Sequence, residues 1–333
     1  MLGLWLQFIA CAGVILIAGT YVSKYGDIIA EKTGLGRTWI GVILIASVTS
    51  LPELVTGISS VAVFNLPDIA VGNILGACML NLLMMSILDV IGGSAPISTR
   101  VHQGHVLTAG FGILMLGIAS LSVMLAASLP AIGWVGVNSL LFIGCYLVAM
   151  RMVFVYEKRR IAEFVKEMAE EVQYRDISKS KAYAVFAANA VFIIGAAIYL
   201  PALGEDIAAR TGLGQTFVGS VFIALSTTLP ELVVSVSALM IGAADIAVGN
   251  LFGSTVFNVF VLAVDDVFYT AGPLLADVSG DHLVSSLSAM IALSVAIIGL
   301  TYRANKKALF FGWDSLAILA IYVFNLSVLY TMR

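Results

Sequence analysis

Residues 51–55 read Leu-Pro-Glu-Leu-Val, and residues 229–233 repeat those five residues in the same order. A second segment recurs in the same way, because residues 68–73 match residues 245–250 letter for letter. In each copy of the first segment, an acid follows a helix-breaking proline inside an apolar run. A charged side chain at the centre of a bilayer costs about 2.5 to 3.5 kcal/mol even on a lenient insertion scale. Two acids at matched positions therefore predict a cation site.

The composition around these segments is that of a membrane protein. Of the 333 residues, 60% are hydrophobic and 11% are charged. Apolar runs of about 20 residues, each long enough to cross a bilayer as a helix, follow one another with short gaps. We predict an all-α polytopic membrane protein with ten transmembrane helices, at residues 2–23, 38–63, 68–92, 104–126, 131–155, 183–203, 216–241, 245–270, 284–302 and 309–331.

The basic residues favour one orientation of these helices. If ten helices alternate in direction, 15 of the 17 Lys and Arg residues fall on one side, and only Arg210 and Arg333 fall on the other. Cytoplasmic loops are rich in Lys and Arg, so we expect both termini outside the cytoplasm and a location in the cell (inner) membrane. The first helix has no basic residue before it and no cleavage pattern after it, so we expect it to be retained.

The repeated segments divide the predicted helices into two sets of five. Pro52 and Pro230 are 178 positions apart, and Asn73 and Asn250 are 177 apart. Because five is an odd number, the second set must run through the membrane upside down relative to the first, as in many secondary transporters. The predicted units are a first repeat at 1–155, a cytoplasmic linker at 156–181 that forms a helix on the membrane surface, and an inverted second repeat at 182–333.

The sequence places several oxygen ligands at the depth of the two acids. Glu53 and Glu231 lie near the middle of their predicted helices, as do Asn81 and Asn258. The proline before each acid cannot donate a backbone hydrogen bond, which leaves a carbonyl free beside the carboxylate. Carboxylates surrounded by carbonyl and side-chain oxygens suit Ca²⁺, whereas a soft metal would require His or Cys.

At these residues the chain resembles the sodium/calcium exchanger family of the calcium/cation antiporter superfamily. The family pattern has Thr-Ser shortly before Pro-Glu, then Gly-Asn, and then Gly-Ser followed four residues later by Asn or Asp. The chain carries this pattern in both repeats, at 49–53, Gly72-Asn73, Gly76 and Asn81, and again at 227–231, Gly249-Asn250, Gly253-Ser254 and Asn258.

The resemblance implies exchange of Na⁺ for Ca²⁺ by alternating access. Glu53 and Glu231 would be the central ligands, helped by the backbone of Thr49 and Thr227. The remaining ligands implied, for Na⁺ sites and the flanks of the centre, are Ser50, Thr228, Ser254, the carbonyls of Ala46 and Ala224, Asn81 and Asn258. Charge reasoning agrees, because one Ca²⁺ or two Na⁺ would each balance two carboxylates, so the two ions can compete for one pair of acids.

The chain departs from the family pattern at three places. Ala77 stands where the family has a serine in the first repeat, while Ser254 keeps it in the second. Val48 and Ser226 replace the usual glycine before the threonine, and Asn258 is neutral where some relatives carry Asp. The lower charge disfavours coupling to K⁺. H⁺ stays open as a coupling ion in place of Na⁺, because buried carboxylates readily take up protons.

Other polar residues admit simpler interpretations. We expect Asp89 and Asp266, which end matched helices, to be wetted by water, with a role in ion access as the alternative. We expect Asp68 and Asp245 to cap the helices that they precede. His105, in a short predicted loop, is expected to be solvated.

The sequence also bears on the class of function. A nucleophile with a base, or a His-Glu-x-x-His motif, does not appear, so we do not expect an enzyme. A passive cation channel and an H⁺/Ca²⁺ antiporter remain alternatives, although inverted halves fit an alternating gate better than a channel. We expect Ca²⁺, Na⁺ and the lipid bilayer as partners, with no cofactor, no nucleic acid and no obligatory protein partner.

Overall fold

The structure is a computed structural model, and it describes residues 1–33, 48–125, 128–164, 177–304, 306–307 and 310–332. Within these residues, nine helices are long and apolar enough to cross a membrane. Eight are single helices: α1 (Leu2–Thr33), α4 (Pro67–Ile91), α6 (His105–Met124), α7 (Val137–Phe164), α8 (Lys179–Thr211), α11 (Ala244–Phe268), α12 (His282–Tyr302) and α13 (Trp313–Met332). The ninth joins three pieces in sequence, α9 (Gln215–Val218), the π-helix η2 (Gly219–Ile223) and α10 (Ala224–Met240). The predicted class, a polytopic helical membrane protein, is confirmed.

The remaining elements are short. The helix predicted at 38–63 is described only in its second part, as α3 (Leu51–Ala62), because residues 34–47 lie outside the described chain. A single helical turn, α5 (Ile97–Arg100), follows α4, and the 3₁₀ turn η3 (Leu274–Ala276) follows α11. Two paired strands, β1 (Ala131–Ile132) and β2 (Val135–Gly136), form a hairpin where the fifth helix was predicted to begin.

Local sequence explains where several helices begin and end. Pro67 opens α4 in its first turn, where a missing amide hydrogen costs nothing. Gly212 adopts a positive φ of 71° and closes α8, a conformation that favours glycine. The helices α1 and α8 are longer than predicted, since a membrane helix can continue beyond its apolar part. No Pro or Gly interrupts 151–164, so α7 continues into the predicted linker and a separate surface helix does not begin there.

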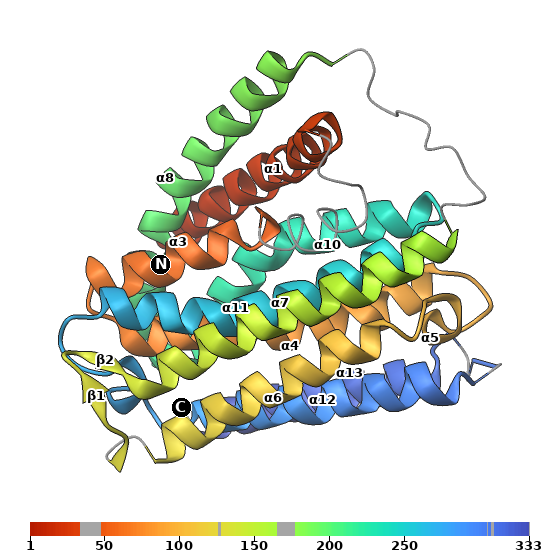
Figure 1. Ribbon diagram of the computed structural model, residues 1–333. Helices are drawn as coiled ribbons and strands as arrows, with labels where there is room; N and C mark the ends of the chain where they lie inside the picture. Colours follow the sequence, from red (N-terminus) through yellow and green to blue (C-terminus); the bar gives the residue numbers. More distant parts are fainter. Residues whose placement is uncertain (34–47, 126–127, 165–176, 305, 308–309, 333) are drawn as a thin grey trace.

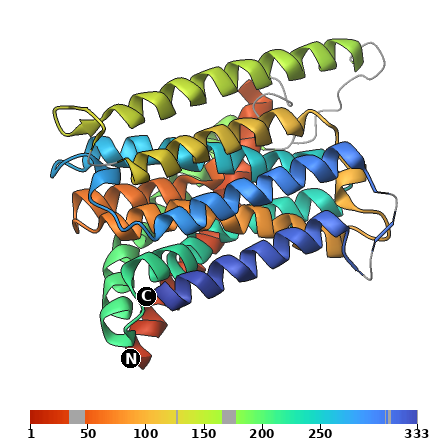
Figure 2. The ribbon, with the colours of Figure 1, turned by 90° about the horizontal axis from the view of Figure 1, so that it is seen from below.

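The helices form a bundle with one oblique pair. In Figure 1, α1 and α8 rise away from the other helices, which lie roughly side by side. Both termini and the β-hairpin lie at one end of the bundle in both views (Figures 1 and 2), and α5 lies at the other. We refer to these as the hairpin end and the α5 end.

The two most buried membrane helices, α4 and α11, run in opposite directions through the bundle. The end of α4 contacts the α5 segment through Asp89 and Ile97, whereas the end of α11 contacts the hairpin through Asp266 and Gly136. Matched helices of the two halves therefore point to opposite faces, as an inverted repeat requires. The residue limits of the three units remain a prediction.

Candidate functional site

The two repeated acids come together where the two halves meet. Glu53 lies in the first turn of α3 and Glu231 lies inside α10. These two helices contact each other, and both pack against α4 and α11. Both carboxyl side chains are fully buried, and they are close enough to interact electrostatically. Two like charges in the core of the bundle require a compensating cation or proton.

Hydroxyl groups hold these acids in a reciprocal arrangement. Ser50 Oγ donates to Glu231 Oε1 at 2.9 Å, and Thr228 Oγ1 donates to Glu53 Oε1 at 3.2 Å. Each hydroxyl stands three residues before the acid of its own half, yet it binds the acid of the other half. The second oxygen, Oε2, of each acid has no hydrogen-bond partner among the described residues. One oxygen on each carboxylate is therefore available to a cation.

A second set of contacts follows the same crossed pattern. Thr227 Oγ1 donates to Asn73 Oδ1 at 3.0 Å, and Thr49 Oγ1 donates to Asn250 Oδ1 at 3.4 Å. The amide nitrogen of Asn250 donates in turn to Ser235 Oγ at 3.1 Å. These bonds tie the Thr-containing segment of each half to the central helix of the other half. Ser235 was not singled out in the sequence, although it stands one helical turn after Glu231.

Two further buried amides lie on the central helices of the two halves. Asn81 on α4 and Asn258 on α11 are fully buried, and neither side chain has a hydrogen-bond partner for its oxygen or nitrogen among the described residues. Each buried polar group left unsatisfied costs about 1–3 kcal/mol, so these amides suit ion ligands or water-binding groups. The carbonyl of Ala224 lies 3.1 Å from Thr227 Oγ1 and 2.5 Å from Thr228 Oγ1, so it shares the single hydrogen of each hydroxyl with Asn73 and Glu53 respectively. Ala46, the other predicted carbonyl ligand, lies outside the described residues.

The two prolines differ in their effect on the backbone. The chain turns at Ser50, and Pro52 lies in the first turn of α3. In the second half α10 continues through Pro230, and the irregular turn is the π-helix η2 upstream. The prediction that each proline breaks its own helix is therefore wrong for Pro230. A wide π turn also leaves carbonyls without their usual donors, so η2 absorbs irregularity that the sequence assigned to the proline.

Small residues allow this wide turn to approach α4. A side chain at Gly76 would collide with the backbone of Ser220, and one at Gly72 would lie only 3.1–3.2 Å from backbone atoms of Gly219 and Ser220. The two glycines therefore permit the close approach of η2 to α4. Ala77, the next residue, is fully buried in an apolar cluster with Ala224, whereas its counterpart Ser254 lies 3.4 Å from Thr49 Oγ1.

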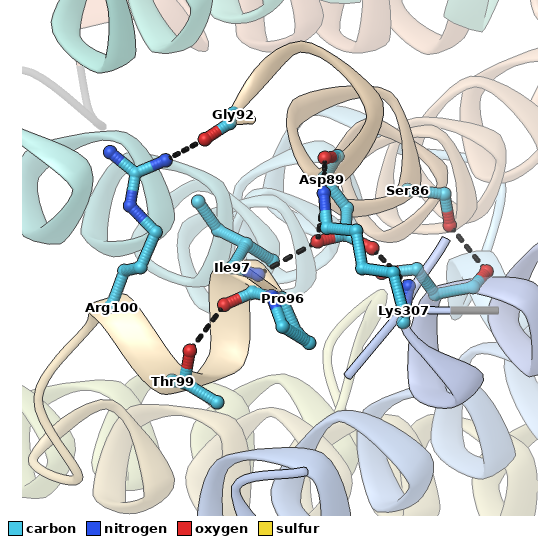
Figure 3. A network of polar contacts seen from close by, with 10 residues as sticks. Ser86, Asp89, Gly92, Pro96, Ile97, Thr99, Arg100 and Lys307 are labelled. Carbon is cyan, nitrogen blue, oxygen red and sulfur yellow. Dashed lines mark hydrogen bonds and ion pairs between the residues drawn. The ribbon is translucent and has the colours of Figure 1, made fainter. Parts of the chain in front are cut away.

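The acids at the helix ends are buried and hydrogen-bonded, which corrects the expectation that water wets them. Asp89 is fully buried: its Oδ1 accepts from the backbone nitrogen of Ile97 at 2.7 Å and lies 3.3 Å from Lys307 Nζ (Figure 3). Asp266 accepts from the backbone nitrogens of Gly136 and Leu274, at 2.8 and 2.6 Å. Backbone donors from the following loop satisfy both carboxylates, so the acids anchor loops. A sequence gives no view of which loop folds back onto a helix end.

The other two acids bind histidines instead of capping their own helices. His282 Nε2 lies 2.9 Å from Asp68 Oδ1, and His105 Nε2 lies 3.0 Å from Asp245 Oδ1. His105 is only 9% exposed, which corrects the expectation that it is solvated. The sequence carries a signal for these pairs. His105 and His282 are 177 positions apart, as are Asp68 and Asp245, so the two histidines occupy matched positions in the two halves.

The chemistry of the centre is that of a hard-cation site. Within the described part of the chain, no three His, Cys, Asp or Glu side chains gather in one place. The negative charge at the centre thus comes from two carboxylates, and the other nearby polar groups are neutral hydroxyls, amides and carbonyls. Oxygen donors of this kind suit Ca²⁺ and Na⁺ better than softer metals.

Comparisons with known proteins agree with this arrangement. The family model described as sodium/calcium exchanger protein matches residues 3–155 and 181–331. The sodium/calcium exchanger MaX1 of Methanosarcina acetivorans is 34% identical over 145 residues, which are 42% of this chain and 38% of that protein. The inner membrane protein YrbG of Escherichia coli is 24% identical over 302 residues, 86% of this chain and 87% of its own. A structure of the sodium-calcium exchanger NCX_Mj shares the fold, with a TM-score of 0.63 and 18% identity over 98% of this chain and 99% of that one.

Proposed function

The chain belongs to the sodium/calcium exchanger protein family, and on that premise we propose that it exchanges Ca²⁺ for Na⁺ across its membrane by alternating access. As a member of that family, the chain is an integral membrane antiporter of the sodium/calcium exchanger type. We further propose which ions it carries, which residues bind them and how exchange occurs.

One observation supports this proposal above the others. Glu53 and Glu231 are buried together, each is held through one oxygen by a hydroxyl of the other half, and each keeps a second oxygen without a protein partner. Two buried negative charges are balanced by one Ca²⁺ or by two Na⁺, but not by both at once. Competition for one pair of acids couples the movement of the two ions.

We assign the ligands as follows. Both carboxylates would bind Ca²⁺ directly, with the backbone of Thr49 and Thr227 beside them, while Asn81 and Asn258 would complete or hydrate the shell. The proposed Na⁺ ligands are Ser50, Thr228, Ser254 and the carbonyls of Ala46 and Ala224. Since Ca²⁺ takes six to eight oxygen ligands, water would complete the shell that these groups begin.

The oblique helix pair is the proposed moving part. Helix α1 packs against α10, and α8 packs against α3, so each touches the helix that carries an acid. A side chain at Gly19 on α1 would collide with the Pro230 ring, and Ser59 Oγ on α3 donates to the carbonyl of Ala197 on α8 at 3.3 Å. A shift of this pair would change the cover over the acids while the rest of the bundle stays in place.

The orientation is also a proposal. Most Lys and Arg residues, including Arg100 and Lys307, follow helices that run toward the α5 end. Cytoplasmic loops are rich in such residues, so we place the α5 end in the cytoplasm, with both termini outside the cell (inner) membrane. Labelling of single cysteines introduced near each terminus, with a reagent that does not cross the membrane, tests this orientation.

Vesicle transport separates this function from its two alternatives. The purified protein is reconstituted into lipid vesicles, and Ca²⁺ uptake is followed while Na⁺, K⁺ and H⁺ gradients are imposed one at a time. We expect an outward Na⁺ gradient to drive uptake and a K⁺ gradient to have no effect. Uptake driven only by H⁺ would support an H⁺/Ca²⁺ antiporter, and uptake that follows the Ca²⁺ gradient without any counter-ion would support a channel.

A further inference from the structure

One carboxylate outside the central site has no counterpart in the other half. Asp265, near the end of α11, is fully buried, and neither of its carboxyl oxygens has a hydrogen-bond partner among the described residues. The matched position in α4, 177 residues earlier, is Leu88, which is fully buried in the apolar core. An acid thus stands in one half where the other half has an aliphatic side chain.

The carboxyl group of Asp265 lies against the helix that carries Glu53. A side chain at Gly57 on α3 would collide with both carboxyl oxygens. Gly57 comes one helical turn after Glu53, and its counterpart in the second half is Ser235. The Asp265 carboxyl group therefore takes up the space that Ser235 fills with its own side chain in the other half.

Other polar groups around this contact also lack partners. Thr56, the residue before Gly57, has a buried hydroxyl without a hydrogen-bond partner in the described chain. The amide nitrogen of Asn73 has none either, whereas its counterpart Asn250 donates to Ser235. The first half thus lacks the hydrogen bond that Asn250 and Ser235 make in the second half. Asp265 lies against Gly57, where that bond is missing.

The surrounding charges do not neutralise Asp265. The neighbouring Asp266 accepts hydrogen bonds from Gly136, Ser139 and Leu274, whereas Asp265 accepts none among the described residues. Of the titratable side chains described on α11 and on the elements packed against it, only Asp266 interacts electrostatically with Asp265; the set comprises Glu53, Asp68, Cys78, Asp89, Arg100, His105, Cys145, Tyr146, Arg151, Tyr156, Glu231, Asp245 and Asp266.

We propose that Asp265 is a proton-binding site, protonated in the conformation described here and able to release its proton when water reaches the contact between α3 and α11. An isolated carboxylate is too costly to bury without a partner, and both carboxyl oxygens of Asp265 lie against α3 at Gly57. The ligand is H⁺, and the site is separate from the two acids of the central pair. For its effect on transport this inference rests on the proposed exchange of Na⁺ and Ca²⁺, but proton binding itself does not.

Infrared spectroscopy of the full chain in lipid tests the proposal without a transport measurement. In the Glu53→Gln/Glu231→Gln background, we expect the carbonyl stretch of a protonated carboxylic acid at neutral pH, and we expect Asp265→Asn to abolish that band. A spectrum that Asp265→Asn leaves unchanged would overturn the proposal. If saturating Na⁺ removes the band that Asp265 gives, the site binds a metal ion, and the proposal is overturned as well.

A variant taken from the other half guards against a folding artefact. Asp265→Leu introduces the residue of the matched position, and we expect it and Asp265→Asn to keep or raise the melting temperature, since a neutral side chain suits a site without partners. If both variants fail to fold, Asp265 makes an essential contact and the proposal is wrong. If vesicles show no Na⁺/Ca²⁺ exchange but the infrared band behaves as expected, the proposed function fails and the proton site stands.

Discussion

In the first half the chain turns at Ser50 just before α3, whereas at the matched Thr228 the second half stays helical and α10 continues through Pro230. The hydroxyls nevertheless bind the acids in the same crossed way in both halves. Similar sequences thus make the same contacts on different backbones. The proposed alternating access requires the two inverted halves to differ in conformation at any moment, and this difference supports that proposal.

The two halves also differ at matched positions of the sequence. A conformational change cannot remove these differences. Asp89 pairs with Lys307, while its counterpart Asp266 binds Ser139 and backbone donors. Ala77 offers a methyl group where Ser254 offers a hydroxyl. The two central acids are the same in both halves, whereas these positions differ. The halves should therefore respond alike to changes at the acids and unlike elsewhere.

The largest expected effect tests the equivalence of the acids. Glu53→Gln and Glu231→Gln should each abolish Ca²⁺ flux in vesicles, because each removes one of the two charges that balance the ion. Both variants should stay folded, since Gln keeps the shape of Glu. Glu205→Gln, at an exposed position on α8, is the control and should transport normally. Flux at the wild-type level in either central variant would show that the two acids are not equivalent.

The next prediction compares the stability that Asp89 and Asp266 contribute at the ends of α4 and α11. Asp89→Asn should destabilise the fold by about 3–5 kcal/mol, because it leaves the nearly buried Lys307 charge without its partner. Asp266→Asn removes no ion pair and should cost about 1.5–3 kcal/mol through weaker hydrogen bonds. Thermal unfolding in detergent measures both. Adding Lys307→Met to Asp89→Asn should restore part of the loss, and equal losses in the two single variants would contradict the contrast between the halves.

A smaller effect tests the crossed hydroxyls. Ser50→Ala should weaken Ca²⁺ binding through Glu231, and Thr228→Ala should weaken it through Glu53. A hydrogen bond to a charged group contributes about 1.5 kcal/mol, which corresponds to a roughly tenfold loss of affinity for each variant. Calorimetric titration with Ca²⁺ measures it, with Ser122→Ala on α6 as the control. A tenfold loss in one variant and none in the other would mean that the site is one-sided.

The smallest expected effect concerns the mismatch at Ala77. If Na⁺ is the coupling ion, Ala77→Ser should raise the apparent Na⁺ affinity several-fold, since one added polar contact contributes about 0.5–1.5 kcal/mol. Ser254→Ala should lower it by a similar factor. Na⁺-driven Ca²⁺ flux is titrated with Na⁺ for both variants. Identical curves for Ala77→Ser and wild type would place Ala77 away from any Na⁺ site, in keeping with its apolar neighbours.

The sequence predicted the helical class and most helix positions because long apolar runs and repeated motifs carry that information directly. It also placed Glu53 and Glu231 together, since matched positions in inverted halves meet at the centre. It could not predict that Ser50 and Thr228 bind across the halves, because spacing along a helix relates residues only within one half. The π-helix and the unpaired Asp265 depend on packing between distant segments, which neither periodicity nor spacing encodes.

The central claim is that both halves contribute one acid to a single Ca²⁺ site that Na⁺ also occupies. Calorimetric titration of the purified protein with Ca²⁺, at rising fixed Na⁺ concentrations, tests this claim most directly. We expect one Ca²⁺ per chain, an apparent affinity that falls as Na⁺ rises, and no measurable binding in either Glu53→Gln or Glu231→Gln. Ca²⁺ binding that Na⁺ does not weaken, or that survives the loss of either acid, would contradict the account.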